Sequence, residues 1–333
     1  MKNIPGILVI VILMISCDKS NENLKNHNTM NTDFNTHILD GYFIQSIVFD
    51  QSGNAWIGTF NQGLIKYNPE ETTIYNAENS PFKDTSVIYD IAVDSKNNIW
   101  IACESLIKFD GEEFVIYNSG NTPIPEDFIS SVDIDSEDNI WFSSSRFRQG
   151  GVVKYDNTDW TVYTPDNSDL PVNFVRSIAV DKQDNVWLAL NEIVNDACLV
   201  KISGDDWTIY TSDDLGFTPY YFGDIKVNSK NQLCGAIDYS LSSLYYHSGP
   251  DAFIFDGNTA KQLQHDSIRS TRFITVDDED NIWFGMYGGF AVYDGHDWFI
   301  DLTGFKEEGV FAIEQSPDNK IWIGTGNGIY ISD

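Results

Sequence analysis

Histidine is a common metal ligand and proton carrier, and this chain has five, scattered along its length. None has the HExxH pattern or the paired spacing of metal ligands: His27, His37, His247, His265 and His296. The sequence also lacks a GxSxG nucleophile motif and a glycine-rich phosphate loop. We therefore predict no metal and no cofactor. A catalytic role stays open because His247 and His265 could approach one another on the face opposite His296.

Two acid-rich segments have the composition of calcium loops. They are DIDSEDN, from Asp133 to Asn139, and DDEDN, from Asp277 to Asn281. Both lack the glycine and the later bidentate acid that an EF-hand loop requires. Both also lie where every repeat of the chain has a turn, and Asp and Asn side chains accept backbone hydrogen bonds in turns. We therefore predict that these acids cap turns.

The charge balance narrows the range of partners. The 333 residues include 50 acidic and 20 basic ones, for a formal net charge of −30. Such a charge argues against nucleic acid and against anionic membrane patches as partners. Three cysteines lie in apolar, strand-like contexts, at Cys103, Cys198 and Cys234. They are either buried thiols or one disulfide plus a free thiol.

One stretch, DSKNNIWIA from Asp94 to Ala102, recurs along the chain. Clear copies begin at Asp50, Asp135, Asp181 and Asp277, and altered copies begin at Asn228 and Ser316. The tryptophan position recurs about every 39 to 49 residues, which is the length of a propeller blade. It is occupied by Trp56, Trp100, Trp141, Trp187, Cys234, Trp283 and Trp322. We expect these tryptophans to pack each sheet against its neighbour.

Each repeat predicts four short strands. In the second repeat, residues 87–93 alternate in polarity, and residues 99–102, 106–110 and 113–117 follow as further strands. Asp-Gly pairs such as Asp110-Gly111 indicate hairpin turns between the third and fourth strands. No stretch has a convincing helical period, so the predicted class is all-β.

The two ends of the repeat array complement each other. The seventh repeat stops after three strands, at GIYISD, while a spare strand-like stretch, DFNTHIL from Asp33 to Leu39, precedes the first repeat. The spare strand can complete the last blade and remove the open edge. We predict a seven-bladed β-propeller of four-stranded blades over residues 32–333, closed by this amino-terminal strand.

The recurring text I-x-x-D-x-x-x-N-I-W-I-G-T…G-L-x-K-Y-D resembles the two-component-regulator propeller repeat. The clearest copies are Asp50 to Tyr67, Asp94 to Asp110 and Asp277 to Asp294. That repeat forms the sensory propellers of bacterial hybrid histidine kinases that respond to polysaccharides, and it also occurs in shorter secreted proteins. The resemblance implies the fold and transfers no functional residue. The sequence has no membrane span after the repeats and no kinase domain, so we expect no signalling of that kind.

Loops between the second and third strands lengthen in three consecutive repeats. They are residues 143–151, 191–197 and 238–251. Functional residues often sit on variable loops carried by a rigid scaffold, although neutral drift in loop length is the alternative. These loops supply the candidate binding residues Arg146, Phe147, Arg148, Glu192, Tyr239, Tyr245, Tyr246 and His247.

A variable position near the start of each innermost strand indicates the same face. It reads Gln45, Tyr89, Ser130, Arg176, Gly223, Arg272 and Phe311, and we call these residues the mouth column. A variable, often polar position among constant apolar ones is expected to line the top of the central channel. Arg176 and Arg272 suggest an anionic or hydroxyl-rich ligand, and we add Tyr89 to the candidate binding residues.

Residues 1–17 are predicted to form a targeting signal. Lys2 precedes an apolar segment, residues 7–15, that is too short to span a bilayer. Met14-Ile15-Ser16-Cys17 resembles the lipobox of bacterial lipoproteins, which implies lipidation of Cys17, although leucine is usual at the position of Met14. An ordinary secretory signal with an incidental cysteine is the alternative. Residues 18–31 are polar and are predicted to form a flexible tether.

Together these features predict a lipid-anchored, non-catalytic binding protein of the bacterial cell envelope, at the outer membrane and facing the periplasm or the surface. The expected ligand is a glycan or a peptide at the loop-rich face over blades 3 to 5. One alternative is an enzyme resembling streptogramin lyases, and another is a scaffold for an envelope protein partner. The membrane contact is expected through the lipid anchor only.

Overall fold

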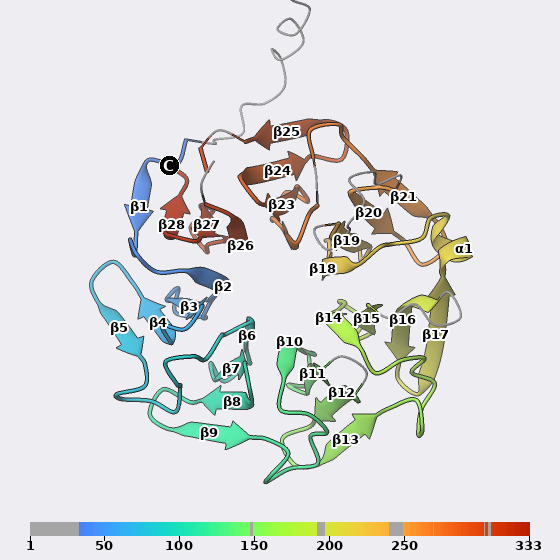
Figure 1. Ribbon diagram of the computed structural model, residues 1–333, viewed down its shortest axis with the longest axis horizontal. Helices are drawn as coiled ribbons and strands as arrows, with labels where there is room; N and C mark the ends of the chain where they lie inside the picture. Colours follow the sequence, from blue (N-terminus) through green and yellow to red (C-terminus); the bar gives the residue numbers. More distant parts are fainter. Residues whose placement is uncertain are drawn as a thin grey trace, which may run out of the picture. The chain divides into compact units, whose positions relative to one another are not determined.

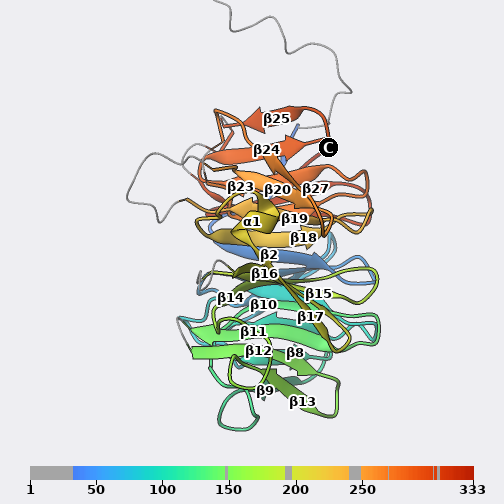
Figure 2. The same ribbon diagram turned by 90° about the vertical axis from the view of Figure 1, so that its right-hand side faces the viewer.

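The computed structural model describes residues 33–333 except 147–148, 192–196, 240–248, 269, 303 and 306–307. Residues Asp33–Asp333 form one compact unit. It consists of seven separate antiparallel sheets of four strands each, arranged as a ring around a central axis (Figure 1). Seen from the side, the strands stack around the ring as successive blades (Figure 2). The predicted seven-bladed, all-β propeller is therefore confirmed.

Blades 1 to 7 are numbered by their innermost strands, and each blade is built outward from there. The innermost strands are β2 (Ile44–Phe49), β6 (Asp90–Val93), β10 (Ile129–Ile134), β14 (Val175–Val180), β18 (Phe222–Val227), β22 (Phe273–Val276) and β26 (Val310–Gln315). The second strands are β3 (Ala55–Thr59), β7 (Ile99–Ala102), β11 (Ile140–Arg146), β15 (Val186–Leu190), β19 (Leu233–Ile237), β23 (Ile282–Met286) and β27 (Ile321–Thr325).

The third strands are β4 (Leu64–Tyr67), β8 (Leu106–Phe109), β12 (Gln149–Tyr155), β16 (Ala197–Ser203), β20 (Ala252–Phe255), β24 (Gly289–Tyr293) and β28 (Gly328–Ile331). The outermost strands are β5 (Thr72–Tyr75), β9 (Phe114–Tyr117), β13 (Trp160–Tyr163), β17 (Asp206–Thr211), β21 (Ala260–Leu263), β25 (Trp298–Asp301) and β1 (Thr36–Ile38). Within the described ranges there is a single short helix, α1 (Ser212–Leu215), which no helical period in the sequence indicated.

The amino-terminal strand closes the ring as predicted. β1 pairs antiparallel with β28, and Thr36 lies opposite Ile331. The ring of Phe34, just ahead of β1, packs edge-on against Phe290 of blade 6 at a centroid distance of 5.5 Å. Blade 7 therefore takes its outermost strand from the start of the chain, and we call its junction with blade 1 the closure boundary.

The recurring aspartate explains why the repeat keeps its sequence. In blade 2, Asp94 accepts hydrogen bonds from the backbone N–H groups of Lys96 (3.0 Å) and Asn98 (2.8 Å). It also accepts one from the side-chain amide of Asn98 (2.7 Å) and one from the indole N–H of Trp100 (3.1 Å). One carboxylate thus holds the turn and orients the buried tryptophan. The same bond to tryptophan occurs in Asp50–Trp56, Asp135–Trp141, Asp181–Trp187 and Asp277–Trp283.

The altered copies lose this arrangement in different ways. Asn228 still caps its turn through Gln232, but Cys234 stands where the tryptophan would be and is buried. In blade 7 the aspartate is replaced by Ser316, and the buried indole N–H of Trp322 finds no hydrogen-bond partner within the described part of the chain. Cys103, Cys198 and Cys234 are buried, and no disulfide joins them.

The same turns also join neighbouring blades. The backbone N–H of Ser95 donates to Asp138 Oδ1 at 2.9 Å, and the Ser95 hydroxyl donates to Asp138 Oδ2 at 2.5 Å. The acidic turns are thus used for hydrogen bonding, as expected. Equivalent backbone-to-side-chain bonds link Gln51 to Asn97, Ser136 to Asp184, Lys182 to Asn231 and Ser229 to Asp280. Between blades 6 and 7 the backbone N–H of Asp278 donates instead to the side chain of Gln315, at the end of β26.

The closure boundary has the wrong residues for such a bond. Pro317 occupies the donor position of blade 7 and has no backbone N–H, while Gly53 occupies the acceptor position of blade 1 and has no side chain. The ring is therefore closed by the pairing of β1 with β28 within blade 7 and by hydrophobic packing across the boundary, where Trp322 and Ile329 share a cluster with Ile44.

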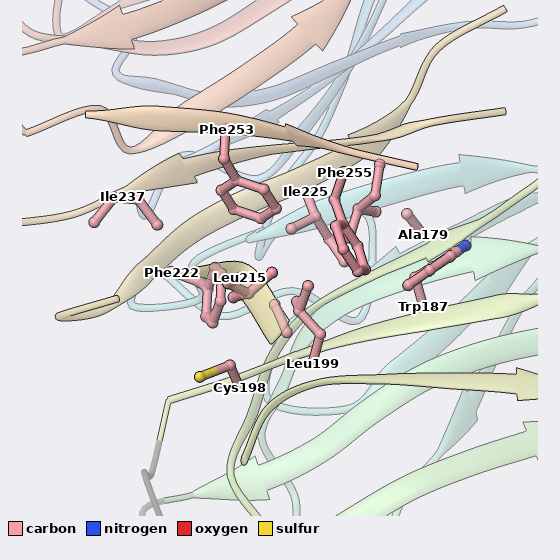
Figure 3. Packing of buried hydrophobic residues seen from close by; sticks show 12 residues of the cluster. Ala179, Trp187, Cys198, Leu199, Leu215, Phe222, Ile225, Ile237, Phe253 and Phe255 are labelled. Carbon is pink, nitrogen blue, oxygen red and sulfur yellow. The ribbon is translucent and has the colours of Figure 1, made fainter. Parts of the chain in front are cut away.

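The hydrophobic core lies between the blades. Figure 3 shows the cluster between blades 4 and 5, to which Trp187, Phe253 and Phe255 belong together with Leu215 from α1. Glycines of the second strands allow this close approach. A Cβ atom at Gly58 would lie 2.5 Å from Cγ2 of Ile88 in the next blade, and one at Gly324 would lie 2.6 Å from Cγ2 of Ile44 across the closure boundary.

Candidate functional site: the central cavity

The central channel contains a cavity of about 220 Å³ that is open to water. Residues from the innermost strands of blades 1 to 7 line it, and the mouth column supplies one residue from each blade: Gln45, Tyr89, Ser130, Arg176, Gly223, Arg272 and Phe311. The sequence alignment of the repeats thus identified residues that line the cavity. Whether these residues bind a ligand stays a prediction.

Polar side chains deeper in the channel join each innermost strand to the next. Asp90 Oδ2 accepts a hydrogen bond from the backbone N–H of Val132 (3.0 Å). Asp133 Oδ2 likewise accepts from Val180 (2.7 Å), so each carboxylate bonds to the following blade. Ser131 and Ser177 accept backbone bonds from blades 4 and 5 in the same manner. Asp90, Ser131 and Ser177 therefore have a structural role besides lining the cavity, and Asp133 has the same structural role outside the lining.

A single lysine stands among the acids of the channel. Burial opposes the charge of Lys226, yet four carboxylates together raise its pKa: Asp224, Asp90, Asp133 and Glu314. Burial also raises the pKa of Asp90 to about 6 and that of Glu314 to about 7, although the nearby Lys226 charge opposes both shifts. Two carboxyl groups of the cavity therefore change protonation near neutral pH.

The two arginines of the mouth column are balanced by acids. Arg272 Nε lies 3.2 Å from Asp238 Oδ2, and its guanidinium lies 5.8 Å from the centre of the Phe273 ring. Burial lowers the pKa of Arg176, while Asp224 and Asp238 favour its charged form and Arg272 disfavours it. The mouth of the cavity thus presents hydrogen-bond donors and acceptors side by side, with no large excess of positive charge.

Only some of the candidate loop residues of blades 3 to 5 are among the described residues. The segment 143–151 is less of a loop than predicted, because β11 continues to Arg146 and β12 begins at Gln149. Tyr239 is half-buried, donates its hydroxyl to the Pro250 carbonyl (3.2 Å) and stacks against Tyr220 with ring centres 6.1 Å apart. The remaining loop candidates lie outside the described residues: Phe147, Arg148, Glu192, Tyr245, Tyr246 and His247.

The sequence analysis did not identify a set of aromatic residues near the mouth column. Two residues ahead of the mouth column, four blades carry an aromatic residue: Phe43, Phe128, Phe174 and Tyr221. Phe128 packs against Tyr89 with ring centres 5.1 Å apart, and Phe43 packs against Phe311 at 4.5 Å. Reading the same repeat alignment two positions earlier would have found them.

The described part of the chain offers no metal centre. No group of three or more His, Cys, Asp or Glu side chains in it is arranged to hold a metal ion. His265 Nδ1 accepts a hydrogen bond from the backbone of Ser267 (3.1 Å), and His37 stacks on Tyr330 at 4.3 Å. Neither histidine lines the cavity.

Two segments of the chain, residues 38–61 and 169–192, match the model of the two-component regulator propeller family. Both contain the turn and tryptophan of the repeat, in blades 1 and 4. No curated protein matches the chain in sequence. The helix found among the described residues is too short and too polar to cross a membrane.

Solved structures from bacteria share the fold. The extracellular domain of a protein described as a hybrid two-component system of B. thetaiotaomicron superposes with a TM-score of 0.67 at 18% identity, covering 88% of this chain and 39% of that one. A second extracellular domain from B. thetaiotaomicron, described as part of a one-component system, gives 0.69 at 18% identity, with coverages of 88% and 41%. This chain thus spans about two fifths of the length of those extracellular domains.

A catalytically inactive virginiamycin B lyase from Staphylococcus aureus, solved with quinupristin, gives a TM-score of 0.71 at 12% identity. The match covers 90% of this chain and 98% of the lyase. At such identities these similarities establish the seven-bladed fold alone.

Proposed function

We propose that the propeller is a non-catalytic recognition module that binds a hydroxyl-rich ligand, a sugar or short glycan, in the central cavity. The observation that carries the proposal is the lining of that cavity. One variable residue from each blade meets at its mouth, and arginine, tyrosine, serine and glutamine side chains stand there beside acids. Binding sites commonly combine a concave surface with a few convergent polar groups of this kind.

The charge balance favours a sugar over an anion. Arg272 is paired with Asp238, and Arg176 faces Asp224 and Asp238, so neither arginine offers an uncompensated charge. A carboxylate or sulfate would also meet Asp90 and Glu314 deeper in the cavity. Each sugar hydroxyl can both donate and accept a hydrogen bond, so a sugar can bind a cavity wall that presents donors and acceptors side by side.

The candidate loops of blades 3 to 5 would add contacts at the same face. Arg148 and Tyr246 are the residues we choose to test there, because arginine and tyrosine are common binding hot spots. A peptide ligand is the competing outcome of the binding test.

We place the protein in the bacterial cell envelope, held by a lipid on Cys17. The lipobox-like sequence supports the anchor, and the extracellular domains that share the fold are consistent with a position outside the cytoplasm. A lipid anchor would leave residues 18–31 as the spacer between the membrane and the propeller.

A lyase-like activity is the second candidate, because the lyase matches this chain over nearly the full length of both. His247 is the residue that would carry it, in the long loop of blade 5. Turnover of a bound ligand that is abolished by His247→Ala would replace the recognition proposal with an enzymatic one.

The test is a binding screen of the purified protein against sugars, oligosaccharides and peptides, followed by calorimetry with each hit. Arg176→Ala and Arg272→Ala should weaken sugar binding about thirtyfold, the usual cost of truncating an arginine hot spot. Arg148→Ala and Tyr246→Ala test the loops in the same assay. Lys96→Ala removes an exposed cation from a turn between first and second strands and serves as the control. Unchanged affinity in all four site variants would show that the ligand binds at another site.

A further inference from the structure

Four phenylalanine rings form a continuous row that leaves the central cavity and crosses the closure boundary. The ring centres of Phe273 and Phe311 lie 6.0 Å apart, those of Phe311 and Phe43 4.5 Å, and those of Phe43 and Phe60 5.3 Å. Phe273 and Phe311 line the cavity, whereas Phe60 in blade 1 is 43% exposed. We call these four residues the phenylalanine row.

The row is held in place by its backbone and by its neighbours. The N–H of Phe43 donates to Gln62 Oε1 (3.0 Å), and the N–H of Phe60 donates to the Phe43 carbonyl (2.9 Å). Gly309 lies against the ring of Phe311, where a Cβ atom would be only 2.6 Å from Cζ. The exposed end of the row is therefore a positioned surface, unlike an isolated surface phenylalanine, which is ordinary in proteins.

A second hollow begins where the row ends. It has a volume of about 300 Å³. Part of its wall comes from Tyr42 and Asn61, the chain neighbours of Phe43 and Phe60, and from Gln62, whose side chain accepts the Phe43 N–H. The rest of the wall consists of Gly63, Ile74, Asn76, Ala77, Glu78, Lys83 and Asp84. Asn61 is exposed, and an asparagine amide both donates and accepts hydrogen bonds. We call this the blade 1 hollow.

We infer that the ligand is a glycan chain of several sugars that runs from the central cavity over the phenylalanine row into the blade 1 hollow. This extends the proposed function and rests on it. A sugar ring has an apolar C–H face and a rim of hydroxyls, so it fits an aromatic surface with polar groups at either side. The row supplies such a surface, and the cavity and the hollow supply the polar groups. This site lies over blades 6, 7 and 1, away from the long loops that the sequence singled out.

The test compares chain lengths. Malto-, cello-, xylo- and chito-oligosaccharide series, each from the single sugar upward, are titrated into the purified protein by calorimetry. For the series that binds, affinity should rise with length. Phe60→Ala should lower the affinity for long chains about tenfold, the loss expected for one stacking aromatic, and leave the shortest binding sugar unaffected. Asn61→Ala should act on the same long chains, whereas Arg176→Ala should weaken short and long chains alike.

Two variants complete the design. Phe60→Trp keeps a stacking surface and should restore long-chain binding, while Phe299→Ala removes a similarly exposed phenylalanine (36%) from outermost strand β25 and should change nothing. Short sugars that bind with Arg176 dependence, combined with unchanged long-chain affinity in both Phe60→Ala and Asn61→Ala, would overturn the extended site and leave the proposed function standing. Absence of binding by every series would overturn both.

Discussion

Asp94 accepts the indole hydrogen bond of Trp100 at 3.1 Å, six residues further along the chain and across one turn. Both residues are buried, so the bond forms away from water. The arrangement recurs in five blades and is missing in blade 7, where the Trp322 indole has no partner among residues 33–333 as described. The protein therefore contains the same motif with and without the indole hydrogen bond, so the contribution of that bond to stability can be measured by comparing blades 2 and 7.

Replacing the two tryptophans by phenylalanine should separate the hydrogen bond from the packing. Both changes remove similar buried surface, but only Trp100→Phe strips Asp94 of a partner. We expect Trp100→Phe to lower the free energy of unfolding by about 1.5–3 kcal/mol more than Trp322→Phe does, the usual contribution of one hydrogen bond to a charged group. Urea titrations of both variants measure it. Equal losses would mean that the indole hydrogen bond contributes nothing net.

The cavity carboxyls predict an unusual pH dependence. Burial raises the pKa of Glu314 from 4.5 to about 7 and that of Asp90 from 3.8 to about 6, so the folded protein holds protons that the unfolded chain releases. Stability from these two groups is therefore fully present below about pH 4 and is lost as the pH rises toward 7. Hydrogen bonds from Ser95 lower the pKa of Asp138, which acts in the opposite direction at acid pH.

Glu314→Gln isolates this effect, because glutamine cannot titrate. The decline in melting temperature between about pH 4 and 7 should become smaller in the variant than in the wild type. Glu112→Gln, an exposed substitution in a turn, is the control. An unchanged slope in Glu314→Gln would show that the pKa of Glu314 is the same in the folded and unfolded states.

The closing strand should be essential to the whole ring. Deleting residues 18–40 removes β1 and exposes the edge of β28, so we expect a large fall in the midpoint of unfolding. Deleting residues 18–31 shortens only the predicted tether and is the matched control. Thermal unfolding followed by circular dichroism distinguishes them. If the two deletions melt alike, β1 contributes little to the closure.

Lipid attachment is predicted at Cys17. Cells grown with a fatty-acid probe should label the wild-type protein and leave Cys17→Ala unlabelled, and the variant should leave the membrane fraction or accumulate as its precursor. Cys103→Ala controls for loss of a different cysteine, one that is buried in the propeller. A wild-type protein that takes up no label would identify the amino terminus as an ordinary secretory signal.

The fold could be predicted from the sequence because its strongest interactions are local. The Asp94 carboxylate accepts hydrogen bonds from Lys96, Asn98 and Trp100 within one turn. Because the interacting residues lie within a single repeat, they recur as a motif that can be recognised in the sequence. The closing strand could be predicted by counting strands, because the seventh repeat has only three and one further strand precedes the first repeat.

The site could be predicted only in outline. The mouth column follows from strand alternation, which is also local. The pairing of Arg272 with Asp238 joins residues from different blades. Of the acids around Lys226, Asp224 lies on the same strand, but Asp90, Asp133 and Glu314 come from other blades, so no single repeat shows the cluster. The phenylalanine row depends on ring closure itself, because Phe43 and Phe311 come from opposite ends of the chain.

The closure boundary has a mechanical consequence. Tension applied through the residues before Asp33 would act first on β1, a three-residue strand, at the one blade junction where Pro317 and Gly53 preclude the turn hydrogen bond. Phe43 follows β1 by only a few residues, so the same load would reach the phenylalanine row. A ligand spanning that row would brace blades 7 and 1 against being pulled apart, and a protein tethered at its amino terminus would resist stretching better when occupied than when empty.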